Sequence, residues 1–570
     1  MATSKHPVCL AAEQALARGE WAEARAAFES IVLVNESAEA LEGLGTAAWW
    51  LDLAELVFDS RERAYRLYLA DHRKTDAARV AVWLGWDYWA FRGESAVANG
   101  WLQRARRLLA SQPACAERAW LEVRQSSFCL LAYNDPLQAL AMANEGIRIA
   151  REVGNVDLEM LGIALQGLVL VTTGSVREGM GHLDEVNAAV IAGELTDRVA
   201  IGLAGCYLIA ACERVHDFDR ALQWCKRLKA YCLTWGLQPL FAVCRTQYAS
   251  ICLWRGTWLE AEEELRAAAE ELTASRPAMT VDAWVKLGEL RRRQGRLAEA
   301  EVLFAQCPLH GDGLLGRAEL AMDRGDYASA TEHAERYLRH MPVSNRIGRA
   351  AGLEIVARAL TSAHDPQHAE CYVEELSNIA DEVSTISLRA SANFAAGSLA
   401  AAQGKTDTAR QCFEDAVDSY QRSGAPFETG KARFQLANCL RLLGREQAAI
   451  AEARLALDLF QRLTAEFESA RVQHFLETSL LRMSQAAKGS SPAGALRSGK
   501  PRSDTLTGLT GREVEVLRMV GEGLSNQSIA ERLFLSDHTV HRHLANILNK
   551  LNVPTRAAAV AQAARRGLIS

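Results

Sequence analysis

One structural unit recurs along most of this chain, from about residue 9 to residue 480. In each copy, an amphipathic helix ends at a short turn and a second helix follows. The equivalent turn positions are Gly19, Leu51, Gly93, Asn134, Gly174, His216, Gly256, Gly295, Gly325, His364, Gly404 and Gly444. Nine of the eleven separations between neighbouring positions lie between 39 and 42 residues. This fixed period predicts an all-α solenoid of about twelve stacked helix pairs.

The turns have a distinctive composition. Eight of the twelve positions are glycine, which suits a left-handed backbone just past a helix end. Small residues soon after the turns are expected to let the two helices of a pair approach closely; they are Ala22, Ala261, Ala298, Ala328 and Ala409. The pattern resembles the tetratricopeptide-repeat superfamily, although the units are nearer 40 residues than the usual length of roughly 34. This resemblance implies architecture and no specific ligand.

The tryptophans and cysteines are both expected to have core roles. Seven tryptophans fall in the first quarter of the chain: Trp49, Trp50, Trp83, Trp86, Trp89, Trp101 and Trp120. Bulky core fillers are favoured for them over an aromatic ligand pocket. The chain has thirteen cysteines, an odd number without C-x-x-C spacing. They are expected to be reduced core thiols and not disulfides or zinc ligands.

Charge and composition divide the chain into three parts. Residues 1–483 form the predicted repeat array and carry a net charge of −12. Residues 484–506 are rich in Ser, Gly, Ala and Pro and carry +3, which predicts a flexible basic linker. Residues 507–570 also carry +3. An acidic body with a basic tail suggests that the tail meets a polyanion.

No targeting or membrane segment is expected. The N-terminal residues run directly into an amphipathic helix and lack a signal-peptide pattern. The most apolar run is taken to be Val199–Cys212, which is shorter than the roughly 18 residues that a membrane span needs. The chain is therefore predicted to be cytoplasmic, with no membrane partner.

Four short helices are expected in the last part of the chain. Thr510 and Glu513 form a capping box for the first, and Ser525 caps the second. A tight turn then leads to Ser536 as the cap of the third, and Thr555 opens the fourth. Two short helices joined by such a turn, with basic residues nearby, predict a helix-turn-helix domain.

The third of these helices has two distinct faces at 100° per residue. Its apolar stripe consists of Val540, Leu544, Ile547, Leu548 and Leu551. The opposite face carries His538, Arg542, Ala545, Asn546 and Asn549. Arg542 lies nearest the centre of that face and is expected to read guanine, because a guanidinium can pair with it bidentately. Asn546 is expected to contact adenine or a phosphate.

The same stretch resembles the LuxR/FixJ-type DNA-binding domain over about the last 62 residues. The matching positions are Leu509, Thr510, Arg512, Glu513, Glu515, Val516, Leu517, Gly523, Ser525, Asn526, Ile529, Ala530, Leu533, Ser536, Thr539, Val540, His543, Ile547, Lys550 and Leu551. The resemblance implies binding to double-stranded promoter DNA in the major groove. The expected DNA-binding residues are Ser525, Asn526, Ser536, Thr539, His541, Arg542, His543, Ala545, Asn546 and Lys550.

Two departures from the family pattern limit what can be carried over. His541 replaces the usual Lys, and Ser528 replaces the usual acidic residue. The target DNA sequence is therefore not expected to follow the family's. In the family, the fourth helix commonly pairs two domains, which implies a homodimer here. Small residues on this helix would permit close packing between two copies; they are Ala557, Ala558, Ala561 and Ala564.

Other chemistry receives little support. His538, His541 and His543 do not share one helix face with a fourth ligand, so DNA or packing roles are favoured over metal binding. The segment Gly404-Lys405-Thr406 lacks the glycine that a phosphate-binding loop needs six residues before the lysine, and it is interpreted as a repeat turn. No catalytic constellation stands out. The chain is therefore predicted to have no enzyme activity, metal or cofactor.

Three functions remain open at this stage. The leading hypothesis is a one-component transcriptional regulator whose array receives a signal from a protein, peptide or small-molecule effector. The second is an interaction scaffold whose last domain contacts another protein. The third is a nucleotide-hydrolysing regulator, for which Lys405 is the only indication.

Overall fold

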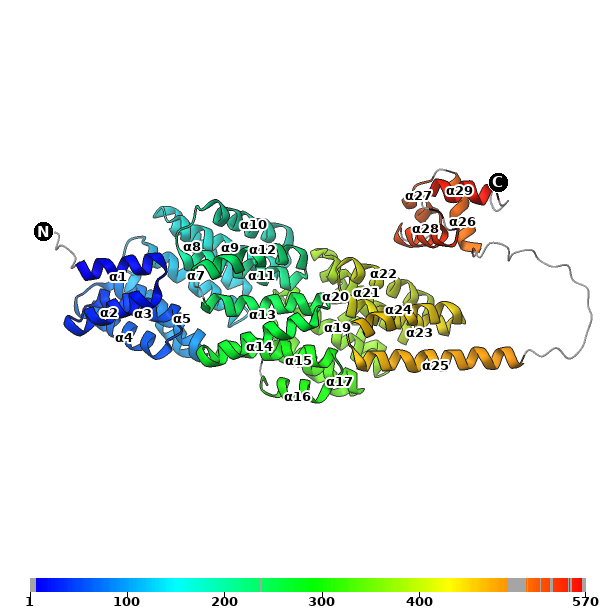
Figure 1. Ribbon diagram of the computed structural model, residues 1–570, viewed down its shortest axis with the longest axis horizontal. Coiled ribbons are helices and arrows are strands. Elements are labelled where there is room, and N and C mark those ends of the chain that lie inside the picture. The colour runs from blue at the N-terminus through cyan, green and yellow to red at the C-terminus, as the bar shows by residue number, and fades with distance from the viewer. Residues whose placement is uncertain are drawn as a thin grey trace, which may run out of the picture. The chain divides into compact units, whose positions relative to one another are not determined.

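The computed structural model describes residues 7–235, 238–308, 310–489, 509, 511–522, 524–533, 537–551, 553 and 556–565. Regular secondary structure within these ranges is helical, without a strand, so the predicted all-α class is confirmed. The chain divides into two compact units, Met1–Met483 and Ser484–Ser570, which are drawn in Figure 1. Each unit is described separately below.

The first unit is an array of helix pairs followed by one further helix. Its first twelve helices are α1 (Pro7–Arg18), α2 (Trp21–Val34), α3 (Ala38–Trp50), α4 (Ala54–Ala70), α5 (Lys74–Arg92), α6 (Ser95–Leu109), α7 (Ala116–Leu131), α8 (Pro136–Glu152), α9 (Val156–Thr173), α10 (Val176–Ala192), α11 (Arg198–Val215) and α12 (Phe218–Trp235). The remaining elements are α13 (Gln238–Arg255), α14 (Trp258–Ser275), the 3₁₀-helix η1 (Pro277–Met279), α15 (Thr280–Arg293), α16 (Leu297–Ala305), α17 (Gly311–Arg324), α18 (Tyr327–His340), α19 (Arg346–Ser362), α20 (Pro366–Val383), α21 (Ile386–Ala402), α22 (Thr406–Arg422), α23 (Pro426–Leu442), α24 (Glu446–Arg462) and α25 (Glu466–Gly489).

The turn inside each helix pair contains a residue with a left-handed backbone, as the glycine pattern predicts. Eleven of the twelve predicted positions have positive φ: Gly19, Gly93, Asn134, Gly174, His216, Gly256, Gly295, Gly325, His364, Gly404 and Gly444. In the twelfth turn the left-handed residue is Asp52 and not the predicted Leu51. Aspartate adopts this conformation more readily than leucine because its short side chain bonds locally. Gly404 and Lys405 therefore belong to a helix–helix turn, as interpreted.

Close approach within each pair depends on one buried position. The residue five places after each left-handed turn residue is fully or almost fully buried: Ala24, Val57, Ala98, Ala139, Gly179, Ala221, Ala261, Ala300, Ala330, Ala369, Ala409 and Ala449. The predicted Ala261 and Ala409 occupy this position. Ala22, Ala298 and Ala328 do not and are exposed. They precede the buried position by two residues, which places them about 200° away around the helix.

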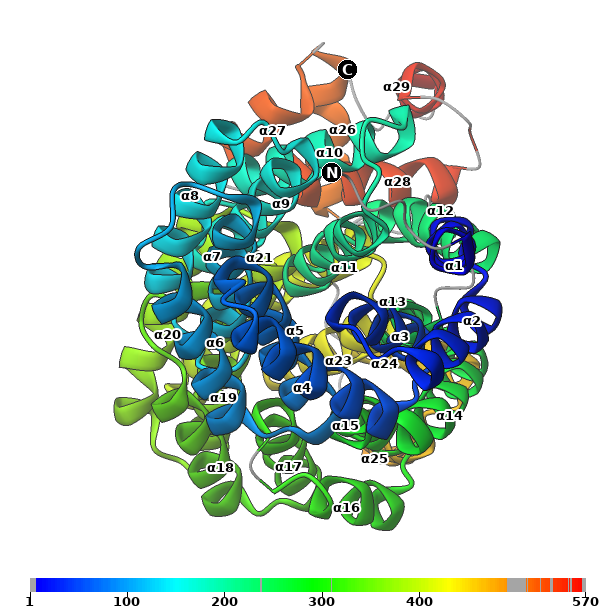
Figure 2. The ribbon, with the colours of Figure 1, turned by 90° about the vertical axis from the view of Figure 1, so that its left-hand side faces the viewer.

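The array also coils until successive turns of the coil touch. The guanidinium of Arg198 on α11 donates to the carbonyl oxygen of Leu16 on α1 at 3.1 Å and lies 4.4 Å from the ring of Trp235 on α12. Arg276 donates through Nε to Asp52, 224 residues earlier, at 2.7 Å. Figure 2 shows the resulting curve nearly end-on. The inner face of the array is therefore enclosed in places by residues that lie about 200 positions apart.

The tryptophans and cysteines have mostly core roles. Trp49 and Trp50 are buried, as predicted, whereas Trp83, Trp86 and Trp120 are half-buried and surround the guanidinium of Arg124 at 5.2, 4.3 and 4.7 Å from their ring centroids. Among the ten cysteines whose side chains are described, none forms a disulfide and seven are buried. The prediction of reduced core thiols is confirmed for these seven.

Two segments differ from the sequence interpretation. Helix α25 continues to Gly489, so it enters the segment predicted as a linker from residue 484; residues 490–508 lie outside the described residues. Helix α9, and not Val199–Cys212, is the described helix long and apolar enough to cross a membrane. Its residues Leu161, Leu165 and Leu168 are fully buried inside the array, which is the behaviour of a core helix.

Candidate nucleic-acid interface

The second unit has a small hydrophobic core of its own. It contains α26 (Gly511–Gly521), α27 (Asn526–Leu533), α28 (Asp537–Leu551) and α29 (Arg556–Arg565). The buried core side chains come from all four helices: Val516, Leu517, Val520, Ile529, Ala530, Leu533, Val540, Leu544, Ile547, Leu551, Ala559 and Ala563. Four helices in this order, with α27 and α28 joined by a short connection, confirm the predicted helix-turn-helix fold.

The apolar stripe predicted on α28 faces this core. Val540, Leu544, Ile547 and Leu551 are buried, and Leu548 packs at the edge of the core. Asn546, predicted on the opposite face, is exposed. The helical phase of α28 is thereby fixed, because four buried positions and one exposed position agree with a single orientation. The outward side of the helix is the one that the sequence assigns to DNA.

Helix α27 begins with a serine cap. The Ser525 hydroxyl accepts a hydrogen bond from the backbone N–H of Ser528 at 3.1 Å and lies 2.9 Å from the Ser528 hydroxyl. Such a cap satisfies one of the free N–H groups of the first turn. Ser525 is exposed beside Asn526, whose side-chain Oδ1 is buried without a hydrogen-bond partner. These two predicted site residues thus lie together at the N-terminus of α27.

Lys550 has a role that the sequence does not reveal. Its ammonium donates to both carboxylate oxygens of Glu513 on α26, at 2.8 and 2.7 Å. Glu513 is only 3% exposed, whereas the Lys550 side chain is 38% exposed. The positive charge of Lys550 is therefore committed first to holding α28 against α26. The capping-box prediction for Glu513 rests on Thr510, which lies outside the described residues.

Arg512 is a residue whose structural role was missed. Its guanidinium donates to the carbonyl oxygen of Leu533 at 2.9 Å, at the end of α27, and also pairs with Glu515 at 2.6 Å. A carbonyl in the last turn of a helix has no partner within that helix. Arg512 therefore connects α26 to the start of the turn between α27 and α28. Its place in the matched family pattern was the only sequence signal for such a role.

Several expected site residues cannot be placed beyond their helix. Thr539, His541, Arg542 and Ala545 belong to α28, but their side chains lie outside the described residues. Ser536 lies outside them altogether. His543 is half-buried on the flank of the same helix. The assignment of Arg542 to the centre of the outward face therefore rests on the helical phase alone.

The last helix closes the domain and presents a small-residue face. Gln562 donates to the carbonyl oxygen of Leu551 at 3.0 Å, which joins α29 to the end of α28. Ala559 and Ala563 are buried in the core of the unit. Ala561 and Ala564 are exposed, so two of the four small residues expected at a dimer contact are available at the surface. Among the described residues, no group of three or more His, Cys, Asp or Glu side chains could hold a metal ion.

Two family models match the chain. Residues 507–563 match bacterial regulatory proteins of the luxR family, and residues 394–463 match a tetratricopeptide repeat. The second unit is therefore a helix-turn-helix domain of the LuxR family. Residues 394–463 of the first unit are tetratricopeptide repeats, in keeping with the resemblance that the sequence predicts.

Relatives of known name share a short part of the chain. A nitrate/nitrite response regulator protein homolog of Haemophilus influenzae is 54% identical over 54 residues, which is 10% of this chain and 26% of that protein. The transcriptional regulatory protein DegU of Brevibacillus brevis is 44% identical over 61 residues, or 11% and 26% of the two chains. A Mycobacterium tuberculosis protein named as an HTH-type transcriptional regulator is 52% identical over 59 residues, or 10% and 7%. The chain thus spans 26% or less of these relatives.

One solved structure matches over most of the chain. It is a chain in the crystal structure of the APC/C hetero-tetramer Cut9-Hcn1, at a TM-score of 0.47 and 14% sequence identity. The match covers 85% of this chain and 91% of that chain.

Proposed function

We propose that this chain, which carries a LuxR-family helix-turn-helix domain, is a one-component transcriptional regulator. Helix α28 enters the major groove of promoter DNA, and the tetratricopeptide array receives the signal. The observation that carries the proposal is the match of residues 507–563 to the LuxR family. The buried stripe on α28 supports it, because Asn546 on the other side of the helix is exposed.

The proposed contacts fall into two groups. Arg542, His541, Ala545 and Asn546 on α28 address base edges, and the arginine is expected to be the strongest reader of sequence. Residues at helix starts or on the flanks of α28 position the domain on the phosphate backbone; they are Ser525, Asn526, Ser536, Thr539, His543 and Lys550. Of these, Lys550 is expected to act mainly through its ion pair with Glu513.

The proposal also covers the oligomeric state of the chain, its location in the cell and its lack of catalytic activity. The exposed Ala561 and Ala564 support a homodimer through α29, which would bind a dyad-symmetric site. The family of the second unit and the burial of α9 support a cytoplasmic protein without a membrane partner. We further propose that the chain regulates without catalysing a reaction.

The test uses the whole 570-residue chain. Genomic fragments captured by the tagged chain are compared with random duplex DNA at two salt concentrations. Arg542→Ala is expected to weaken binding to the captured site by about 1–3 kcal/mol, or roughly 5- to 150-fold, and to leave random DNA almost unchanged. Arg462→Ala is the matched control, because it removes an exposed arginine from α24 in the array.

Either of two results would overturn the proposal. In the first, the full chain retains no DNA, even at low salt where phosphate contacts are strongest. In the second, Arg542→Ala leaves both affinities unchanged. A uniform loss on all DNA would instead make Arg542 a phosphate contact, and the assignment of base reading to it would be wrong.

A further inference from the structure

A closed part of the coil contains a cavity of about 230 Å³. Its walls come from segments far apart in the sequence, from Arg214 on α11 to Lys431 on α23. The volume is far above the roughly 10–15 Å³ that one water needs. It is slightly below the range of about 300–1,000 Å³ that is typical of sites for drug-sized ligands. The space therefore suits a small metabolite and is too small for a folded peptide segment.

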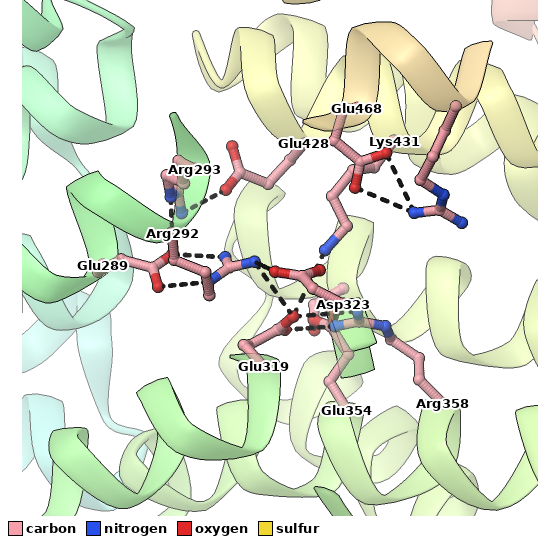
Figure 3. A network of polar contacts seen from close by, with 12 residues as sticks. Glu289, Arg292, Arg293, Glu319, Asp323, Glu354, Arg358, Glu428, Lys431 and Glu468 are labelled. Atoms are coloured by element: carbon pink, nitrogen blue, oxygen red, sulfur yellow. Dashed lines mark hydrogen bonds and ion pairs between the residues drawn. The ribbon is translucent and has the colours of Figure 1, made fainter. Parts of the chain in front are cut away.

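Charged side chains of both signs on α15, α17, α19 and α23 form the floor of this cavity, and Figure 3 shows them pointing toward one another. Arg292 on α15 donates to Glu289 at 2.8 and 2.7 Å and to Asp323 on α17 at 2.7 Å. Glu319 on α17 accepts from Arg358 on α19 at 2.5 Å. The lining contains four cations and four carboxylates: Arg214, Arg292, Arg293, Lys431, Glu289, Glu319, Glu354 and Glu428.

Pairing keeps these groups ionised despite their burial. Burial alone raises the pKa of Glu319, but Arg358, Lys431 and Arg292 outweigh it and hold that pKa well below its ordinary value. The pKa of Arg292 is raised well above its ordinary value because Glu289 and Asp323 outweigh the opposing effect of burial. The charged side chains of the lining are thus fixed in position and carry no net charge in sum. An ion of a single sign would gain little from such a lining and would lose its own hydration.

One ion pair of the lining is left half-satisfied. Arg293 on α15 binds Oε1 of Glu428 on α23 through Nη2 at 2.7 Å. The Nε of the same guanidinium donates to Glu289 at 2.7 Å, but its second terminal nitrogen, Nη1, is buried without a hydrogen-bond partner, as is the other oxygen of the Glu428 carboxylate, Oε2. The Arg293 side chain is 9% exposed. A buried donor and a buried acceptor left unpaired each cost about 1–3 kcal/mol, and a ligand with both an acceptor and a donor would relieve the two together.

Another cation of the lining, Arg214, has no carboxylate partner among the described residues. Arg214 donates to the hydroxyl of Thr172, and no ion pair joins it to a described carboxylate within 4.0 Å. Burial lowers its pKa below the ordinary value for arginine. The lining also contains aromatic rings: the His216 ring lies 3.9 Å from that of Trp254, and Phe427 and Tyr420 are the others. The cavity lining therefore combines equal numbers of positive and negative side chains, one cation without a described carboxylate partner and several aromatic rings.

We propose that this cavity binds a free α-amino acid as its zwitterion. The carboxylate faces Arg214 and the unused nitrogen of Arg293, the ammonium faces the unused oxygen of Glu428, and the side chain lies against Trp254 and Phe427. This assignment rests on the proposed function in one respect, because it makes the amino acid the signal that the array receives. Bound between α11, α15 and α23, the ligand would clamp neighbouring turns of the coil together.

The binding test uses the intact chain and defined probes. Each of the twenty free L-amino acids is titrated by calorimetry, and thermal unfolding is followed with and without ligand. At saturation we expect the best amino acid to raise Tm by about 2 °C or more. Its decarboxylated amine and its deaminated acid carry one charge each. Both are expected to bind at least tenfold more weakly than the amino acid.

Variants then locate the site. Glu428→Gln keeps the shape of the side chain and is expected to weaken binding of the amino acid at least tenfold. Glu301→Gln is the control, because Glu301 forms a comparable ion pair with Arg324 at 2.8 Å on the exposed surface and is not part of the cavity. Should Glu428→Gln unfold, the comparison of amino acid, amine and acid on the unaltered chain still decides the question.

Three results would overturn the inference: none of the twenty amino acids binds, a singly charged analogue binds as well as the amino acid, or Glu428→Gln binds normally. DNA binding by the same samples is measured independently. Failure to bind DNA while the amino acid binds would overturn the proposed function and leave the site intact. Normal DNA binding that the bound amino acid does not alter by at least threefold would show that the site is not the signal input.

Discussion

Glu513 illustrates how one residue can decide the orientation of a recognition helix. Its carboxylate is buried and takes up the ammonium of Lys550 with both oxygens. Sequence comparison assigns Lys550 to the DNA surface, because charge and family pattern are all that it reveals. Which face of α26 meets the end of α28 depends on packing between residues 37 positions apart, and no local pattern encodes that contact.

We expect Glu513→Gln to destabilise the second unit by about 1–3 kcal/mol, since the change removes the buried charge that partners Lys550. Hydrogen exchange of peptides from 511–551 measures the effect. All thirteen tryptophans lie in the first unit, so tryptophan fluorescence should report an unchanged array. Glu515→Gln breaks the half-exposed pair with Arg512 and is expected to cost at most about 1 kcal/mol. Equal exchange in both variants would contradict the prediction.

His216 gives the array a defined response to acid. Burial against Trp254 lowers the pKa of His216 to about 4, whereas an unfolded chain protonates histidine near 6.5. The unfolded state therefore binds the proton first as the pH falls from about 6.5 towards 4. Stability that is present above pH 6.5 is lost over this interval.

His216→Asn should remove this response, because asparagine keeps the left-handed backbone without a titrating ring. Between pH 6.5 and 4, the free energy of unfolding of the natural chain is expected to fall by about 1–3 kcal/mol more than that of the variant. Urea unfolding followed by tryptophan fluorescence measures both. His364→Asn is the matched control at an equivalent, exposed left-handed turn. Parallel curves for the natural chain and His216→Asn would refute the assignment.

At the scale of the element, the turns were predictable because their signal is local. Glycines just past helix ends, together with a period near 40 residues, identified eleven left-handed positions, of which eight are glycine and three are Asn134, His216 and His364. The exception is Asp52. Its turn contains no glycine, so the repeat pattern does not distinguish it from its neighbour Leu51. The buried small residue was harder to place. Several alanines follow each turn, and the sequence does not show which of them lies on the inner side.

Two glycines with open space around them should respond oppositely to alanine. Gly404 has φ of +75° in the turn between α21 and α22, and a Cβ there would meet no atom within 4 Å. Gly404→Ala is expected to cost about 1–2 kcal/mol through backbone strain alone. Gly100 lies inside α6 with the same open surroundings, and Gly100→Ala should stabilise the array by about 0.4–1 kcal/mol. Thermal unfolding of both variants tests the contrast, and shifts of the same sign would contradict it.

At the scale of the whole molecule, the closing of the coil was not predictable. Period and turn chemistry specify how one helix pair packs on the next, but a small change in angle per repeat decides whether distant repeats meet. The contacts that result, such as Arg276 with Asp52, join residues that share no pattern. The cavity and its ionic floor follow from this closure, and for that reason sequence reasoning assigned no residue to them.

Arg276 provides the test of this closure. It is 2% exposed, and its guanidinium lies 4.6 Å from the Trp49 ring and 4.3 Å from the Phe91 ring. Arg276→Met is expected to destabilise the array by about 2–4 kcal/mol, because Asp52 then loses its buried partner. Small-angle X-ray scattering should also show a larger radius of gyration.

Arg151→Met is the control for that experiment. It removes an exposed pair with Glu159 between neighbouring helices, where at most about 1 kcal/mol is at stake. Asp52→Asn combined with Arg276→Met completes a double-mutant cycle, in which coupling of less than about 0.5 kcal/mol would show that the pair does not hold the coil closed.

The same contact has a consequence for synthesis on the ribosome. Each helix pair can pack once it and its neighbour in the sequence have emerged, because repeat arrays propagate from neighbour to neighbour. Asp52, however, must wait for a partner that lies 224 residues later. At about 5–20 residues per second, that delay lasts roughly 10–45 s. Throughout this time the surface around Asp52 is exposed to chaperones and proteases. The susceptibility of the nascent chain to proteolysis therefore depends on the time needed for translation and not on the strength of the final contacts.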